Sequence, residues 1–342
     1  MGHVAPALAV AEALRSRSVK VTFAGSPDRV EARLVPERGY EFDAFRVAGF
    51  PRRPGPALVR ALGLAAAAPV ECLRILSRRR PDVVLGGGGY VAGPMVLAAR
   101  LRGIPAALTE ADAHLGLANR LAAPFARRVF LALPVDGRTG KKYRAVGRPV
   151  PALSRAVPRD EARARLELPA EGPLVLVFGG SLGARLLNEL AVEAWGAAGP
   201  AVLHLCGERD YEGLCGRVSR PEYRLVPFLE QIGLAYGAAD LVVARAGGSV
   251  WELAAAGLPA VLVPGSFATG DHQDKNARWF ERAGGAVVVS EPEAERVPEI
   301  VAGLLAEPER LDRMAGAMRA SAKPNAAEAI ADEIVSLAAA RR

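Results

Sequence analysis

Glycine-rich turns that carry a hydroxyl or a carboxylate recur in the second half of the chain. One of them spans 179–185, Gly-Gly-Ser-Leu-Gly-Ala-Arg, between an apolar run and a helical pattern. Ser181 can donate a hydrogen bond to a phosphate, and Gly183 allows the backbone to approach a ligand closely. Backbone amides at the start of a helix stand at its positive end and favour an anion. The turn therefore suits a diphosphate.

A second turn, at 247–252, adds a carboxylate to the same arrangement. Gly248 and Ser249 precede a helical pattern, and Glu252 lies about one turn further in. The amides of Gly248 and Ser249 can hold a diphosphate, while Glu252 can accept both hydroxyls of a ribose, as an acidic residue does in dinucleotide sites. The spacing of Ser249 and Glu252 also fits a capping box, in which they only cap their own helix. The sequence leaves both interpretations open.

Two further segments carry polar groups at expected strand ends. The loop 269–277, Thr-Gly-Asp-His-Gln-Asp-Lys-Asn-Ala, enters a helix after an apolar run, and ligands of parallel sheets bind at that end of a strand. His272 and Gln273 can bind sugar hydroxyls there. The cluster 86–89 is Gly-Gly-Gly-Gly, followed by Tyr90. Such a cluster fits a ligand loop or a purely structural turn.

Several kinds of chemistry lack their sequence patterns. The chain has no Asp-x-Asp pair for a metal-bridged diphosphate and no GxxxxGK[ST]. Its histidines are not spaced as metal ligands, and His204, in an apolar run, is expected to be a core residue. Three cysteines form no paired framework. We therefore expect neither a metal nor a cofactor.

The charge balance favours an acidic partner. The formal net charge is +7, which suits a nucleotide or an anionic membrane. No motif for nucleic-acid binding accompanies it, so nucleic acid is not expected. An arginine-rich composition without functional meaning would give the same charge. No apolar stretch is long enough to span a bilayer, so the protein is expected to be soluble or to lie on a membrane.

The elements that position these groups alternate between strands and helices. Short apolar runs predict buried parallel strands in an α/β fold at 19–24, 83–85, 106–109, 128–131, 174–178, 202–206, 241–244, 260–263 and 286–289. Prolines within 147–158 predict a linker, which gives domains 1–150 and 151–342. The chain opens on a turn and a helix rather than on a strand, so the first strand of a doubly wound domain is expected to be missing.

Together these motifs resemble the MurG family of glycosyltransferases over nearly the whole chain. Segment 2–11 is similar to the family's GGHVxPxLAVA, 87–94 to its GGYVSGP loop and 179–185 to its GGSxGAR loop. Segments 245–257 and 271–277 are similar to its donor site. The resemblance implies a GT-B fold, in which two Rossmann-like domains with parallel sheets face a central cleft. It also implies that the last helix crosses back to the first domain.

The resemblance further implies an inverting transferase at the cytoplasmic face of the membrane. The second domain would bind UDP-N-acetylglucosamine, and the first would bind undecaprenyl-diphosphoryl-N-acetylmuramoyl-pentapeptide, whose 4-hydroxyl accepts the sugar. By the same resemblance, site residues fall into a donor group and an acceptor group. The first group, called substrate-binding and mostly on the donor side, is Asp112, Arg148, Ser181, Gly183, Gly248, Ser249, Glu252, His272 and Gln273. The acceptor loop is Gly2, Gly88, Gly89 and Tyr90, with His3 similar to the histidine proposed as general base.

Other readings are compatible with parts of the pattern. A different lipid-directed GT-B transferase would share the donor site, and an inactive donor-binding paralogue would explain a missing first strand. A UDP-N-acetylglucosamine 2-epimerase would need further acid and base groups. Segment 52–80 mixes arginines with leucines, which suits docking on an anionic membrane or an ordinary surface helix.

Overall fold

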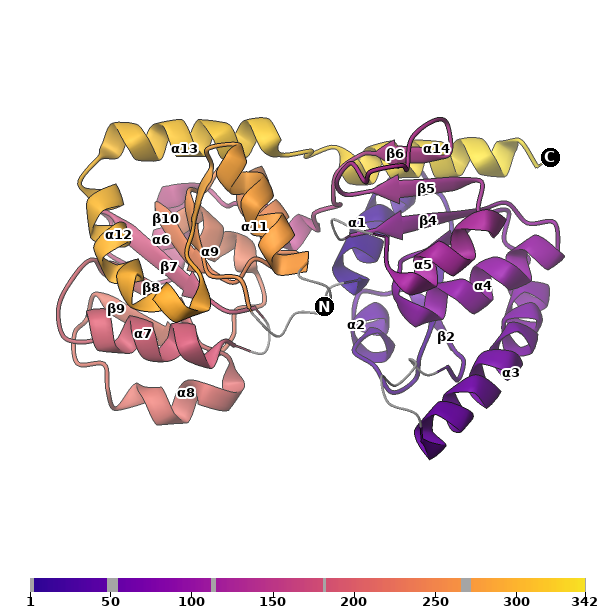
Figure 1. Cartoon of the computed structure of the whole chain (residues 1–342), viewed down its shortest axis with the longest axis horizontal. Helices are drawn as coiled ribbons and strands as arrows, with labels where there is room; N and C mark the ends of the chain where they lie inside the picture. Colours follow the sequence, from indigo (N-terminus) through magenta and orange to yellow (C-terminus); the bar gives the residue numbers. More distant parts are fainter. Residues whose placement is uncertain (1–2, 48–54, 112–114, 181–182, 266–271, 342) are drawn as a thin grey trace. The chain divides into compact units, whose positions relative to one another are not determined.

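Two units of parallel sheet covered by helices make up the chain (Figure 1). The computed structural model describes residues 3–47, 55–111, 115–180, 183–265 and 272–341, of which 56–62, 65, 66 and 272 are described without their side chains. Unit 1 comprises Met1–Pro151 and Lys323–Arg342, and unit 2 comprises Ala152–Ala322. The predicted α/β class with two parallel-sheet domains is confirmed. The chain leaves unit 1 after Pro151, inside the segment predicted as a linker, and returns to it after Ala322.

Unit 1 contains two sheets of parallel strands. The smaller pairs β1 (Thr22–Gly25) with β2 (Glu41–Ala44). The larger is four-stranded, in the order β3 (Val84–Gly86), β4 (Ala106–Glu110), β5 (Arg128–Leu131) and β6 (Tyr143–Ala145). The helices of this unit are α1 (Val4–Arg15), α2 (Glu31–Glu37), α3 (Pro56–Arg79), α4 (Gly89–Leu101), α5 (Leu117–Ala122) and α14 (Ala326–Ala339).

Helix α14 completes the core of unit 1 although it ends the described chain. Its apolar face, with Ile330 and Ile334, packs with Val10 and Leu14 of α1 and with Phe130 of β5. Exposed ion pairs flank this contact, among them one between Arg17 and Asp332 at 2.8 Å. Figure 1 shows α14 alongside the β5–β6 edge of the same unit. Residues 323–342 therefore belong structurally to the first unit.

Unit 2 is built on one six-stranded parallel sheet, in the order β12-β11-β10-β7-β8-β9. Its strands are β7 (Leu174–Phe178), β8 (Ala201–Leu205), β9 (Tyr223–Val226), β10 (Leu241–Ala244), β11 (Ala260–Leu262) and β12 (Ala286–Val288). Its helices are α6 (Arg159–Arg165), α7 (Arg185–Trp195), α8 (Glu208–Cys215), α9 (Ile232–Ala238), α10 (Val250–Ala256), α11 (His272–Arg282), α12 (Val297–Leu305) and α13 (Pro308–Ser321).

The central strands of unit 2 are apolar along their whole length because both faces are covered. Every residue of β7 and of β10 is buried, as expected where helices pack on either side of a parallel sheet. Helices α7 and α12 and strands β7, β8 and β10 contribute to one large cluster of buried side chains. This rigid platform ends in the loops that carry the predicted site.

All nine predicted runs contain or overlap a strand, whereas β2, β6 and β9 were not predicted. Among the described residues, no helix is both long and apolar enough to cross a membrane.

The second half of α3 favours the surface-helix alternative for its own residues, because Ile75 and Leu76 are buried in the core of unit 1. Arg79 pairs there with Asp43 at 2.7 Å. This half of α3 is therefore an ordinary packed surface helix.

Candidate functional site

The strand order of unit 2 places its two predicted glycine turns on neighbouring strands. From β7 the chain adds β8 and β9 on one side of the sheet, and β10, β11 and β12 follow on the other. Open parallel sheets bind ligands beyond the carboxyl ends of the strands at such a reversal. Strands β7 and β10 pair there, with Phe178 opposite Ala244. The turns that leave these two strands, 179–184 and 245–249, thus begin side by side.

The turn after β7 needs glycine at several positions. Gly180 and Gly183 have φ angles of 92° and 72°, and the Gly183 amide donates to the Gly180 carbonyl at 3.0 Å. A Cβ on Gly183 would lie only 2.3 Å from the Cys206 carbonyl oxygen. A side chain there would therefore combine backbone strain with a clash. Ser181 lies outside the described residues, so its predicted contact with a phosphate stays a prediction.

The turn after β10 does not form the capping box that its sequence allows. Ser249 occupies the N-cap position of α10, but its side chain makes no capping hydrogen bond. Among the described residues, none accepts a hydrogen bond from the amides of Gly248 or Ser249. Glu252, the other member of the box, is held by a different residue. The capping alternative is therefore wrong, and two amides are available at the strand end.

Tyr236 of α9 orients the carboxylate of Glu252. Its hydroxyl donates to Glu252 Oε2 at 2.8 Å, and its ring is buried, with its centroid 6.2 Å from that of Phe178. Burial, and then the nearby carboxylate, raises the pKa of Tyr236 well above its ordinary value. The phenol therefore stays protonated and donates. Sequence reasoning missed Tyr236, since nothing near it in the chain marks it as a partner of Glu252.

Two polar side chains hold the neighbouring strand ends in place. Arg245 donates to the Val263 carbonyl at 3.0 Å and pairs with Glu291 at 2.6 Å. The Gln273 side-chain oxygen accepts from the Gly265 amide at 2.8 Å. Gln273 was predicted to contact a sugar, and this bond places it at the carboxyl end of β11. His272 begins α11, and its side chain is not among those described.

In unit 1, His3 lies over the predicted acceptor-side glycine turn. His3 is the N-cap residue of α1 and is exposed. A Cβ on Gly88 would lie 2.8 Å from His3 Nδ1, and one on Gly89 would lie 3.6 Å from His3 Cδ2. The structure therefore brings three of the predicted acceptor-side residues together. The adjacent Tyr90 ring has the Arg29 guanidinium 5.8 Å from its centroid, and Gly2 lies outside the described residues.

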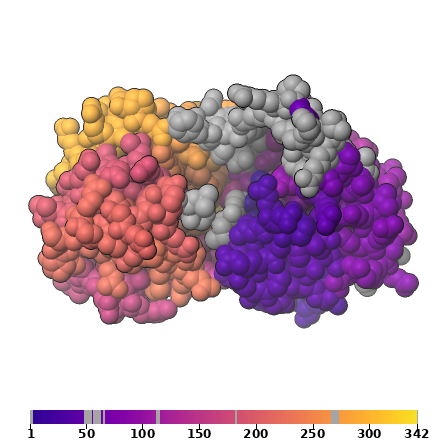
Figure 2. All heavy atoms as spheres, turned by 90° about the horizontal axis from the view of Figure 1, so that it is seen from below, coloured from indigo at the N-terminus to yellow at the C-terminus, as the bar shows by residue number. Residues whose placement is uncertain are grey.

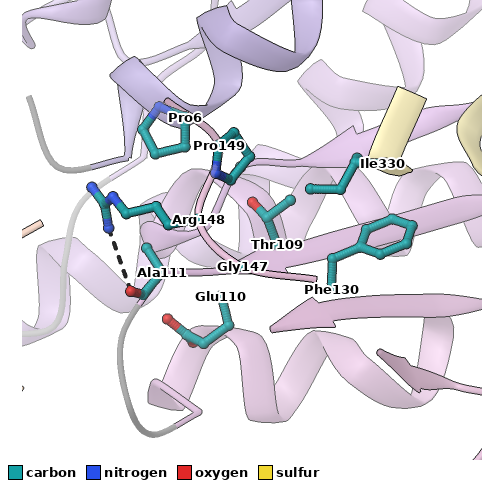
Figure 3. Close-up of a pocket in the computed structure, with 10 residues that line it drawn as sticks. Pro6, Thr109, Glu110, Ala111, Phe130, Gly147, Arg148, Pro149 and Ile330 are labelled. Carbon is teal, nitrogen blue, oxygen red and sulfur yellow. Dashed lines mark hydrogen bonds between the residues drawn. The ribbon is translucent and has the colours of Figure 1, made fainter. Parts of the chain in front are cut away.

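A second polar group lies at the carboxyl ends of β4 and β6 in unit 1 (Figure 3). Arg148 is only 7% exposed, and its guanidinium points at the Ala111 carbonyl, 3.4 Å away. Together with Glu110 it lines a cavity of about 10 Å³, the lower limit for one water molecule. Glu110 accepts from the Gly116 amide and from Asn119, both at 2.9 Å. These contacts hold the Glu110 carboxylate at the end of β4, and Asp112 lies outside the described residues.

Comparison with known proteins agrees with this arrangement. The glycosyltransferase family 28 N-terminal domain matches residues 1–131, and the corresponding C-terminal domain matches 174–330. A protein of Salinibacter ruber is 40% identical over 348 residues, which cover 98% of this chain and 94% of that protein. It is named UDP-N-acetylglucosamine–N-acetylmuramyl-(pentapeptide) pyrophosphoryl-undecaprenol N-acetylglucosamine transferase. A protein of Halothermothrix orenii with the same name is 36% identical, over 94% of this chain and 92% of its own.

Solved structures show the same relationship. The crystal structure of MurG from Acinetobacter baumannii superposes with a TM-score of 0.78 at 31% identity, covering 98% of this chain and 96% of that one. A UDP-GlcNAc 2-epimerase from Neisseria meningitidis, at 14% identity and a TM-score of 0.66, shares the fold alone. With both family domains matched and relatives aligned over nearly their full length, the chain belongs to glycosyltransferase family 28 and, within it, to the MurG family.

Proposed function

We propose that this enzyme transfers N-acetylglucosamine from UDP-N-acetylglucosamine to a lipid-linked N-acetylmuramoyl-pentapeptide. The observation that carries the proposal is the relationship to transferases of that name, at 36–42% identity over more than nine-tenths of this chain. The strand-order reversal in unit 2 supports it, because the turns that carry Gly183, Gly248 and Ser249 leave two neighbouring strands there. The acceptor hydroxyl is the muramoyl 4-hydroxyl, and the product is a β-1,4-linked disaccharide on its lipid.

The donor lies at the carboxyl ends of β7 and β10 in this proposal. Glu252, held by Tyr236, accepts the two ribose hydroxyls. The amides of Gly248 and Ser249 hold the diphosphate, with Ser181 and the Gly183 turn on the neighbouring strand. Gln273 and His272, after β11, contact the sugar. Asp112 and Arg148, in unit 1, are further substrate-binding residues of this proposal.

Inversion at the anomeric carbon requires a single displacement. The acceptor oxygen attacks the face opposite UDP while the bond to the diphosphate breaks and negative charge grows on the leaving group. Amide and hydroxyl donors aimed at that charge stabilise it, and one such donor contributes about 3–4 kcal/mol where it has been removed by mutation. His3 accepts the proton of the acceptor hydroxyl, and its closeness to Gly88 and Gly89, which are proposed for the acceptor side, supports this role.

The proposal includes peripheral contact with the cytoplasmic face of an anionic membrane. Segment 52–64 supplies the arginines and leucines for it, and Val70 of α3 is 51% exposed. Residues 72–79 contribute little, since their apolar side chains face the core and Arg79 is paired. The proposed contact with the membrane is therefore confined to residues 52–70.

Incubation with labelled UDP-N-acetylglucosamine and the lipid-linked muramoyl-pentapeptide tests the reaction. We expect label in a lipid product that releases a β-1,4 disaccharide on mild acid treatment. The matched control replaces the acceptor with a diacylglycerol, which the rival lipid-directed transferases would glycosylate. Binding of UDP without transfer to either lipid would support a donor-binding protein and refute the proposed reaction.

A further inference from the structure

A buried histidine in unit 2 belongs to a continuous chain of hydrogen bonds that the reaction described above does not use. His204 of β8 has no exposed surface. Its Nδ1 lies 2.8 Å from the Tyr223 hydroxyl on β9, and its Nε2 lies 3.0 Å from Asn188 Oδ1 on α7. Asn188 Nδ2 then donates to the Cys206 carbonyl at 2.8 Å and to Asp210 at 2.9 Å. These hydrogen bonds thus link the edge strand β9 to the first turns of α7 and α8.

The partners fix the direction of every bond. Asn188 Nδ2 faces a carbonyl and a carboxylate, which only accept, so Oδ1 must face His204. His204 Nε2 therefore carries the proton and donates to Asn188, and Nδ1 accepts from Tyr223. The imidazole is neutral, and burial lowers the pKa of His204 to about 4. Each group has one set role, which a mobile or partly filled network would lack.

This hydrogen-bond network ends directly behind the glycine turn that follows β7. The carbonyl that Asn188 holds belongs to Cys206, and it is the atom that a Cβ on Gly183 would strike at 2.3 Å. Asn188 also lies in the first turn of α7, where its amide donates to the Ala184 carbonyl at 2.9 Å. The Asn188 side chain therefore holds the wall behind Gly183, while its backbone belongs to the first turn of the helix that begins after it.

The surroundings protect this arrangement from solvent. Helices α7 and α8 lie at the surface of unit 2, and Figure 2 shows the atoms of that surface in pink to salmon. Asn188 is 1% exposed, and Asp210 is further held by Arg209 at 2.8 Å. In such a setting, a lost hydrogen bond leaves its buried partner unpaired, which is unfavourable. A displaced Asn188 would therefore let the Cys206 carbonyl move.

We propose that His204 is a positioning residue for the donor diphosphate, because it orients Asn188 and thereby sets the Cys206 carbonyl against which the Gly183 turn packs. This inference rests on the proposed donor site in unit 2. A histidine that served only the stability of the core would influence unfolding but not the turn. The two roles are separable by measuring nucleotide affinity and thermal stability on the same variants.

The test uses the full chain with His204→Phe, His204→Gln and Val301→Ala. Phenylalanine fills the space without a donor, whereas glutamine can donate to Asn188 and accept from Tyr223. Val301 of α12, 1% exposed in the same core, supplies a destabilised control away from the turn. The measurements are calorimetric titration with UDP and the thermal unfolding midpoint, with titrations run well below the lowest midpoint.

We expect His204→Phe to weaken UDP binding about tenfold, the equivalent of roughly 1.4 kcal/mol, and His204→Gln to restore most of it. Val301→Ala should lower the unfolding midpoint and leave the affinity unchanged. Unaltered UDP affinity in folded His204→Phe would overturn the positioning role, and so would an affinity loss in Val301→Ala that matches its loss of stability. Absence of UDP binding by the unsubstituted chain would instead overturn the donor site on which the inference rests.

Discussion

The pair formed by Tyr236 and Glu252 shows how a single residue type acquires a role from its surroundings. A glutamate on a short helix is by itself an ordinary solvated group. Here a buried phenol, kept protonated by its environment, donates to one carboxylate oxygen and fixes the plane of the group. A carboxylate oriented in advance loses less entropy when it accepts ribose hydroxyls.

Removing the phenol hydroxyl should therefore weaken nucleotide binding. We expect Tyr236→Phe to raise the dissociation constant of UDP about five- to tenfold, because one buried hydrogen bond is worth about 1 kcal/mol. Tyr40→Phe is the matched control, since its buried hydroxyl in unit 1 has no partner among the described residues. Calorimetric titration measures both variants. Equal affinities for Tyr236→Phe and the unsubstituted enzyme would contradict the orienting role.

His204 also predicts how stability depends on pH. Its folded-state pKa of about 4 lies below the ordinary value of 6.5, so the unfolded chain binds the proton first as the pH falls. The neutral His204 contributes fully to the free energy of unfolding above pH 6.5. This contribution is lost progressively as the pH falls toward 4, by up to about 3 kcal/mol. Urea midpoints at pH 7.5 and 5 should differ more for the enzyme than for His204→Gln. If His204→Gln leaves the pH dependence of stability unchanged, the loss of stability at low pH belongs to other titrating groups.

At the scale of elements, the sequence predicts those strands whose side chains are all apolar because both faces of the strand are buried. Runs such as 174–178 and 241–244 were found because strands covered on both faces need apolar side chains throughout. Strands β6 and β9 lie at sheet edges and carry Arg144 and Arg224. The β2 strand, Glu-Phe-Asp-Ala, also has charged side chains. Such short, half-exposed strands lack the apolar signal and were therefore missed.

The candidate site divides along the same line. The glycine turns were predicted because left-handed or crowded backbone demands glycine locally, and Gly183 shows both features. Tyr236, Glu291 and Asn188 were not predicted as partners, because they meet their neighbours only through tertiary structure. The capping box failed for the same reason: Glu252 is drawn to Tyr236, 16 residues away.

Helix α14 gives a test in which two adjacent β-branched residues occupy different faces, one buried and one exposed. Ile334 is 3% exposed in the core shared with α1, whereas Val335 is 40% exposed. We expect Ile334→Ala to destabilise unit 1 by about 2–5 kcal/mol and Val335→Ala to stay within about 0.5 kcal/mol. Chemical denaturation followed by hydrogen exchange of unit 1 amides distinguishes them. Similar losses for both would mean that α14 does not pack as described.

At the scale of the whole molecule, charge is the property that bears on location. A net charge of +7 attracts the protein to anionic lipid, but most arginines of the second half of α3 face ion partners or lie beside the core. Binding to vesicles should therefore depend on arginines that have no such constraint. It should also weaken with added salt, since exposed charges are screened.

Flotation with vesicles of neutral and of anionic lipid measures this directly. We expect the unsubstituted enzyme to float with anionic vesicles, and Arg53→Glu/Arg60→Glu to lose most of that binding. Arg282→Glu/Arg313→Glu makes the same change of net charge on exposed residues of unit 2 and should retain it. Equal loss in both double variants would show that attraction depends on total charge rather than on residues 52–70.

The discontinuity of unit 1 sets the order in which the enzyme can mature on the ribosome. All of unit 2, from Ala152 to Ala322, is synthesised before the α14 segment whose side chains close the core beside α1. A nascent chain can therefore complete unit 2 first, while the apolar face of α1 stays uncovered. That face is buried only when the α14 segment has left the exit tunnel, so the unit that is synthesised first is the last to close its core.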